Sequence, residues 1–177
     1  MPQKILSEGA IAALDRTDRL ILAHLQHNAR LSNKELAAKV GLSPSSCLAR
    51  VRRLEANAVL RGYHADVALE AFGVTLQAMV AVRLEKHVRA AIAAFERHLG
   101  SLPEVLAWHH VAGANDYLVH VAVRDAAHLR EFVLTAFAGR TEVAHLETNL
   151  IFSHRRSIAF GAASKGRGTR QGRDTED

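Results

Sequence analysis

The stretch LDRTDRLILAHLQHNARLSNKELAAKVGLSPSSCLARVRRLE, residues 14–55, decides the fold of the N-terminal part of this 177-residue chain. Asp15 and Asp18 have the spacing of a helix capping box and precede an apolar stripe of helical period. Ser32 and Glu35 repeat that spacing at the start of a second apolar pattern. These signals predict two short helices with defined N-termini.

A third helix follows after a tight turn. Gly41 suits the left-handed residue that ends a helix, and Ser43-Pro44 supplies an N-cap followed by proline at the first helical position. The third helix is expected to run to about Asn57. Two helices joined by a short glycine-containing turn indicate a helix-turn-helix. Residues 59–67 are expected to form a hairpin wing, so residues 14–66 are predicted to be a winged helix-turn-helix domain and 67–73 a linker.

The third helix carries residues suited to DNA, because this helix of such a module lies in the major groove. Its buried face is predicted to contain Cys47, Leu48, Val51 and Leu54. The opposite face is expected to present Ser45, Ser46, Ala49, Arg50 and Arg53, with Arg52 at the flank. The first four of these are expected nearest the bases. The residues expected to contact phosphates are Arg53, Arg61 and Lys34. The competing interpretation is a solvated arginine face with no ligand.

The positive charge is concentrated in this first part of the chain. Residues 1–64 hold ten Lys/Arg and five Asp/Glu, a net of +5, whereas residues 65–160 hold nine and ten, a net of −1. A basic segment attached to a nearly neutral remainder is typical of a module that meets phosphates.

From Val74 the hydrophobic period changes to two, which predicts a strand. Helical and strand patterns then alternate in the order βαββαβ, which predicts an α+β, ferredoxin-like domain over residues 74–158. Its two helices can cover only one sheet face, so the other face is free to pair with another subunit. Residues 159–177 are rich in glycine and charge, and we expect them to be a disordered tail.

Composition excludes several other classes of protein. Cys47 is the only cysteine, so a disulfide scaffold within one chain is excluded. The absence of a membrane-length apolar run and the weakly apolar start favour a cytoplasmic protein. His109, His110 and His120 fall on neighbouring strands, but adjacent residues point to opposite faces, so a metal site is not predicted. No cofactor motif is present.

The chain resembles the leucine-responsive regulatory protein/AsnC family, known as feast/famine regulators. The resemblance covers about residues 14–158 and rests on the stretch 14–55, then RGYHADV, LPEV at 102–105 and VAGANDYLVHVAVRD at 111–125. It implies a sequence-specific, DNA-binding transcriptional regulator modulated by an amino acid or a related metabolite. It also implies pairing through the sheet into dimers, which can assemble further into tetramers or octamers.

The resemblance also implies an effector site between dimers. It is made by the loop residues Gly113, Ala114, Asn115, Asp116 and Tyr117, with Thr148, Asn149 and Leu150 from the facing side. In this site Asp116 can accept an ammonium group, and turn N–H groups can bind a carboxylate. The alternative for the loop is an ordinary hairpin turn.

Two positions depart from the family pattern. Ala58 stands where the family usually has glycine after the recognition helix, so that helix is expected to end differently. Asn115 stands where the family often has an aromatic residue, which affects the usual effector more than the domain.

Two other functions fit part of the pattern. One is a tetrapyrrole (siroheme-type) decarboxylase built on the same architecture, and eleven histidines make it worth naming. The other is a protein that only assembles and senses. The basic helix-turn-helix favours a regulator over both, and no enzymatic activity is predicted.

Overall fold

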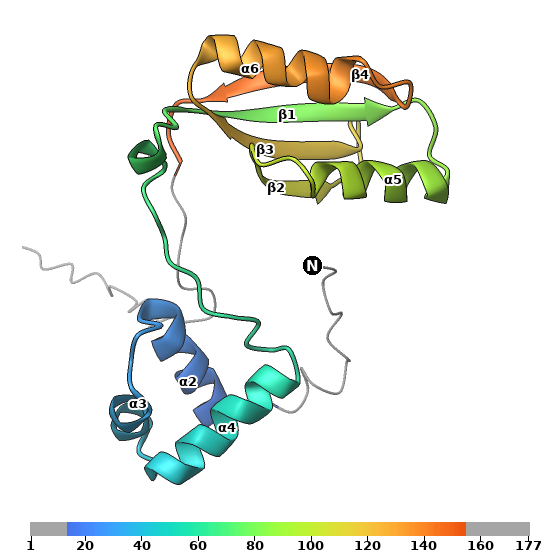
Figure 1. Cartoon of the computed structure of the whole chain (residues 1–177). Helices are drawn as coiled ribbons and strands as arrows, with labels where there is room; N and C mark the ends of the chain where they lie inside the picture. Colours follow the sequence, from blue (N-terminus) through green and yellow to red (C-terminus); the bar gives the residue numbers. More distant parts are fainter. Residues whose placement is uncertain (1–13, 155–177) are drawn as a thin grey trace, which may run out of the picture. The chain divides into compact units, whose positions relative to one another are not determined.

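The computed structural model describes residues 14–154. They form two compact units, and the chain passes from the first to the second between Ala65 and Asp66 (Figure 1). Each unit has its own hydrophobic core. The predicted tail, residues 159–177, lies outside the described residues.

The N-terminal unit contains three helices, α2 (Arg16–His27), α3 (Asn33–Val40) and α4 (Pro44–Ala56). Both predicted capping boxes form at α2 and α3, and Ser43 caps α4 with proline in its first turn. Gly41 ends α3 with a φ of 68°, the left-handed conformation that glycine adopts without strain. The helices enclose a small core of Ile21, Leu25, Leu36, Ala37, Cys47 and Leu54.

The predicted hairpin wing is wrong, because residues 59–68 contain no strand. The N–H groups of Val59 and Leu60 both donate to the carbonyl of Leu54, at 2.9 and 3.0 Å, and so close the end of α4. Donors used in this way are not available for a strand ladder. Residues 61–68, which follow, are exposed and form no helix or strand.

Ala58 also corrects an expectation. We expected α4 to end differently without glycine, yet Ala58 adopts a φ of 57° and is the only non-glycine residue with positive φ among the described residues. The hydrogen bonds of Val59 and Leu60 to Leu54 hold this conformation. Alanine in this region costs about 1 kcal/mol, so strain is stored where α4 ends.

The C-terminal unit has the predicted βαββαβ order, preceded by a short 3₁₀ helix, η1 (Leu69–Phe72). The elements are β1 (Leu76–Leu84), α5 (Arg89–Leu99), β2 (Val105–His110), β3 (Tyr117–Val123), α6 (Ala126–Val133), the π-helical segment η2 (Leu134–Ala138) and β4 (Val143–Ile151). The strands form one antiparallel sheet in the order β2-β3-β1-β4.

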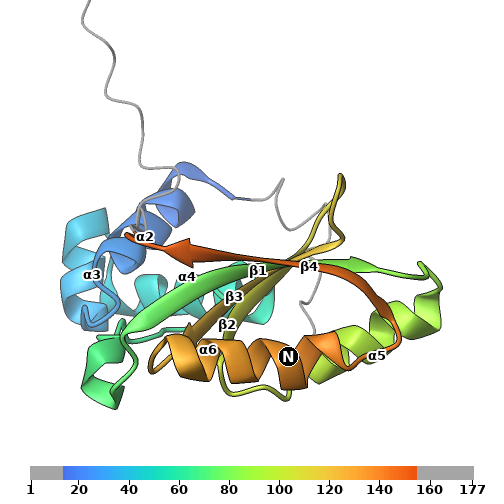
Figure 2. The same cartoon turned by 90° about the horizontal axis from the view of Figure 1, so that it is seen from above.

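Helices α5 and α6 cover the same face of this sheet (Figure 2). The buried residues Ala78, Val80 and Val82 of β1 point into that face, as their alternation predicts, and meet Phe95 of α5 and Phe132 of α6. The opposite face, which we call the open face, carries the intervening residues. No helix over the described residues is long and apolar enough to cross a membrane.

Candidate DNA interface and ligand site

Helices α3 and α4 are locked to each other near the turn between them. The Asn33 side-chain Nδ2 donates to the carbonyl oxygen of Pro44 at 2.8 Å. Ser43 Oγ accepts from the Ser46 N–H at 3.2 Å and lies within hydrogen-bonding distance of the Ser45 and Ser46 hydroxyls. These contacts fix the direction in which α4 leaves the turn.

The exposed side of α4 differs from the predicted one. Ser45, Ser46 and Ala49 are exposed as expected, and so are Arg52 and Arg53, but Arg50 is only partly exposed. Seven residues are almost two helical turns, so Ser45 and Arg52 lie on one line along the helix. Arg52 and Arg53, three and four residues after Ala49, therefore both lie on the exposed side, one to each side of Ala49, whereas Arg50 lies beside the buried face.

Arg50 and Arg53 are held by aspartates of α2 and its N-cap. Arg50 Nη1 donates to Asp15 Oδ2 at 2.6 Å and to Asp18 Oδ1 at 2.9 Å, and Arg53 Nη2 donates to Asp18 Oδ2 at 2.6 Å. The Asp18 N–H and then Arg50 lower the pKa of Asp15. Asp18 is the one buried charged residue of the described chain. The capping-box spacing of Asp15 and Asp18 predicts the start of α2 but does not predict their ion pairs with the arginines of α4.

The two predicted phosphate contacts outside α4 are accessible. Lys34 lies in the first turn of α3 and Arg61 in the extended segment after α4, and both are exposed. Within residues 14–154 neither side chain forms an ion pair.

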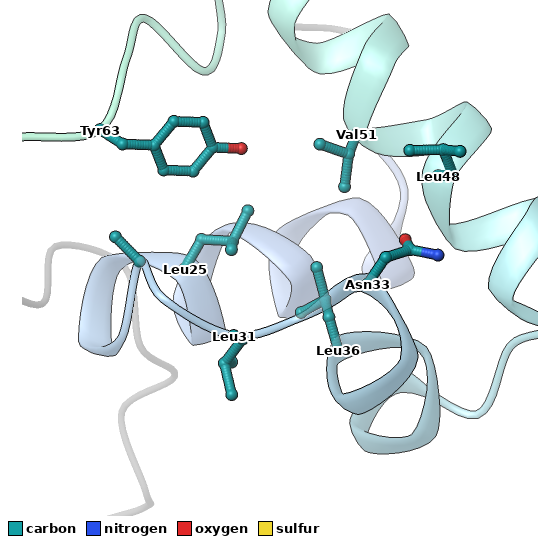
Figure 3. Close-up of a pocket in the computed structure, with 8 residues that line it drawn as sticks. Leu25, Leu31, Asn33, Leu36, Leu48, Val51 and Tyr63 are labelled. Carbon is teal, nitrogen blue, oxygen red and sulfur yellow. The ribbon is translucent and has the colours of Figure 1, made fainter.

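The prediction that Leu48 is buried was also wrong, since its exposure is 38%. It borders an open, mostly apolar pocket of about 200 Å³ in the N-terminal unit (Figure 3). Val51 lies beside Leu48 on α4, and the Tyr63 ring faces the pocket from the extended segment. The other lining residues are Leu25, Ala29, Leu31, Asn33 and Leu36. The apolar side of α4 is therefore only partly covered by the core, and Leu48 lies in the uncovered part.

The predicted effector loop connects β2 to β3. Gly113 has a φ of 134°, which an L-residue rarely adopts, while Ala114 is exposed and Asn115 partly exposed. The loop is closed by the Val111 N–H, which donates to the Asp116 carbonyl at 2.8 Å. The Asp116 N–H in turn donates to the carbonyl of Val82 at 2.9 Å, which ties the loop to β1.

The Asp116 carboxylate already has two partners. Oδ2 accepts from the Leu84 N–H at 2.7 Å, and Oδ1 lies 2.7 Å from His87 Nε2. Burial raises the pKa of Asp116, but the hydrogen bonds from Leu84 and His87, with His110 nearby, bring it below the ordinary value. An ammonium ligand would have to share this carboxylate with His87, a partner that the sequence did not reveal.

Tyr117 lies in the core rather than in the loop surface. Its side chain is buried, its hydroxyl donates to Glu96 Oε1 at 3.1 Å, and its ring stacks on His110 with centroids 4.6 Å apart. Burial and the neighbouring Glu96 raise the pKa of Tyr117. Only the main chain of this residue can face a ligand in this structure.

The two halves of the predicted effector site are not together in one copy of the chain. Tyr117 pairs with Val82 of β1, whereas Thr148 and Leu150 of β4 pair with Val80 and Ala78. Strand β1 therefore lies between the loop and β4, and the register separates them by two to four residues as well. Thr148, Asn149 and Leu150 are all exposed.

The strand histidines take opposite faces, as their adjacency predicts. His109 pairs across the strands with Leu118 and His110 with Tyr117, so they alternate between the open and the helix-covered face. Burial lowers the pKa of His120, with His154 and His109 nearby. Over the described residues, no three His, Cys, Asp or Glu side chains lie close enough together to hold a metal ion.

Both units match known protein families. Residues 14–55 match the AsnC-type helix-turn-helix domain, and residues 77–157 match the Lrp/AsnC ligand binding domain. The HTH-type transcriptional regulator AldR of Mycolicibacterium smegmatis is 42% identical over 146 residues, which are 82% of this chain and 85% of AldR. The leucine-responsive regulatory protein of Escherichia coli is 38% identical over 120 residues, which are 68% of this chain and 73% of that protein.

Solved structures agree. A transcriptional regulator from Neisseria meningitidis, solved as a complex with L-Met, has a TM-score of 0.75 and 33% identity over 81% of this chain and 93% of its own. The AldR structure from Mycobacterium tuberculosis has a TM-score of 0.67 and 37% identity over 82% of this chain and 99% of its own.

The fold and these matches define a DNA-binding transcriptional regulator with a ligand-binding domain, and not an enzyme. The chain belongs to the Lrp/AsnC family of transcriptional regulators. The comparisons give the tetrapyrrole decarboxylase alternative no support.

Proposed function

We propose that this regulator binds duplex DNA by placing the N-terminal part of α4 in the major groove. The observation that carries the proposal is the exposed row of Ser45, Ser46 and Ala49 on a helix whose opposite side is packed into the core. Small side chains allow close approach to base edges, and serine can donate to bases or phosphates. The residues that contact phosphates are Arg61, Lys34 and Arg53, and the Arg53 side chain remains 52% exposed beside its ion pair with Asp18.

A selection from a random duplex library with the full-length protein tests this proposal. The protein should enrich a defined sequence, and its affinity, followed by fluorescence anisotropy, should fall steeply as salt rises. Lys34→Ala and Arg61→Ala should each weaken binding to all duplexes alike and reduce the salt slope by about 0.9. If the wild-type protein retains no duplex at low salt, the DNA-binding proposal fails.

For the second unit, we propose that an amino acid or a related metabolite binds at the loop of residues 113–117. The exposed N–H groups around Gly113 can bind a carboxylate, and Asp116 with His87 can meet an amino group. The related regulator from Neisseria meningitidis was solved with L-Met, which supports this ligand class. Because β1 separates the loop from β4, we place Thr148, Asn149 and Leu150 of another copy opposite the loop.

A thermal-shift screen with the twenty amino acids and common keto acids tests this site. Asn149→Ala should abolish the shift produced by the active ligand. Because Asn149 pairs with Met79 on the open face, the oligomeric mass of the variant without ligand is the control. Asp116→Ala should also abolish the shift. A normal shift in Asn149→Ala would remove β4 from the site, and a normal shift in Asp116→Ala would remove Asp116.

We further propose an even-numbered homo-oligomer in the cytoplasm, paired through the open face of the sheet. That face presents Met79, Leu118 and His120, all partly buried already in one copy. An additional apolar layer would complete their burial. Leu118→Arg should convert the assembly to monomers in light scattering coupled to size-exclusion chromatography, and an unchanged mass would exclude this face.

A further inference from the structure

The three arginines of α4 are not equivalent. Arg50 and Arg53 both donate to Asp18, and Arg50 also donates to Asp15. Arg52 forms no ion pair within the part of the chain that the structure describes. The three arginines therefore differ in their surroundings: Arg50 and Arg53 form ion pairs inside the N-terminal unit, whereas Arg52 remains available to an outside partner.

The anchoring of Arg50 is strong. Both of its acceptors lie on the helix α2 side of the unit, and Asp18 is completely buried. The Arg50 side chain is 29% exposed. Hydrogen bonds to Asp15 and then to Asp18 raise the pKa of Arg50, which fits a firmly held cation. To reach DNA, Arg50 would have to leave two carboxylates, and the buried one, Asp18, would then keep Arg53 as its one cationic partner.

Arg52 has the opposite surroundings. It lies on the same line of α4 as Ser45 and close to Ala49, on the side away from the buried Cys47. Arg53 lies equally near Ala49 on the other side, but Asp18 holds it, so Arg52 is the arginine of the exposed face that no carboxylate of the described residues holds. Alanine at position 49 leaves room for a long neighbour to extend along the floor of the groove.

We propose that Arg52 is the base-reading arginine of this protein and that Arg50 is a positioning residue. Arg52 donates two hydrogen bonds to O6 and N7 of a guanine, a geometry that its planar guanidinium matches. Arg50, held by Asp15 and Asp18, fixes the rotation of α4 about its axis and so directs Arg52 into the groove. This inference rests on the proposed DNA binding.

The test is a parallel library selection with wild type, Arg52→Ala and Arg50→Ala, using the full chain. Arg52→Ala should lose the preference for one guanine of the selected site and bind that site about 5- to 150-fold more weakly, as expected for one bidentate pair. Its melting curve should match that of the wild type. Arg124→Ala removes one exposed charge from the other unit and should change neither property.

Arg50→Ala should lower the melting temperature of the helical unit. Because α4 then loses its fixed rotation, the guanine preference of the folded fraction should be reduced but not lost. Three results overturn the assignment: Arg52→Ala selecting the wild-type sequence, Arg52→Ala weakening all duplexes equally, or Arg50→Ala losing the guanine preference without loss of stability. A wild-type protein that enriches no sequence would instead refute the proposed function itself.

Discussion

Replacing Asp18 with asparagine should destabilise the N-terminal unit far more than one surface charge normally does. Asp18 is completely buried and accepts from Arg50 at 2.9 Å and from Arg53 at 2.6 Å. Each hydrogen bond to a charged group contributes about 1.5–3 kcal/mol. Asparagine keeps one acceptor but turns an N–H₂ group towards a guanidinium, where it finds no acceptor.

The loss is smaller than the full sum of the two bonds. Arg50 retains Asp15 at 2.6 Å, and Arg53, whose side chain is 52% exposed, can recover water. We therefore expect Asp18→Asn to lower the free energy of unfolding by about 2–4 kcal/mol. Small domains have only about 5–15 kcal/mol in total, so this is a large share.

Urea unfolding followed with two probes isolates the affected unit. The single tryptophan, Trp108, lies in the C-terminal unit, whereas circular dichroism at 222 nm also reports α2, α3 and α4. Asp18→Asn should shift the dichroism transition and leave the tryptophan transition in place. Asp66→Asn makes the same chemical change at an exposed site and should shift neither. If the free energies of unfolding of the two variants agree within about 0.5 kcal/mol, the ion pairs of Asp18 with Arg50 and Arg53 contribute no net stability.

Three further predictions follow from single positions. Ala58→Gly should raise the stability of the N-terminal unit by up to about 1 kcal/mol in urea unfolding followed by dichroism, because φ is 57° there, and a decrease would contradict the strain. Phe95→Ala should cost the C-terminal unit about 3–5 kcal/mol by Trp108 fluorescence, because the Phe95 ring is fully buried against Tyr117 at 5.0 Å, and a loss below about 1 kcal/mol would contradict this packing. Since the folded pKa of Asp116 lies below its ordinary 3.8, its stabilisation is complete above that value and is lost as the pH falls through the folded pKa. Asp116→Asn should therefore flatten the loss of stability below about pH 4, and an unchanged pH profile would exclude this role.

Local signals in the sequence were sufficient for most of the fold. The cap residues of α2, α3 and α4 act on backbone groups three positions away, so their spacing alone predicts where each helix begins. The alternation along β1 likewise identifies Ala78, Val80, Val82 and Leu84 as buried, because side chains on a strand change face at every position, while the burial of Ala81 on the other face was not predicted. Both patterns depend on geometry within a single element, and both were confirmed.

The candidate sites were predicted less completely, because their residues depend on partners far away in the sequence. Arg50 meets Asp15 across 35 positions, and His87 meets Asp116 across 29. A periodic pattern records which side of a helix is apolar but contains no information about such partners. The same reasoning explains Leu48, which has an apolar side chain on α4 but too little core to cover it.

The sequence by itself therefore determined the kind of protein, its two units and the helix offered to DNA, because caps and periodicity are properties of short segments. Only the tertiary structure decided which arginines of that helix are held by carboxylates, and that the loop of residues 113–117 and β4 lie on opposite sides of β1. The physical reason is that ion pairs and strand order arise from the packing of distant segments, and packing is a property of the whole fold.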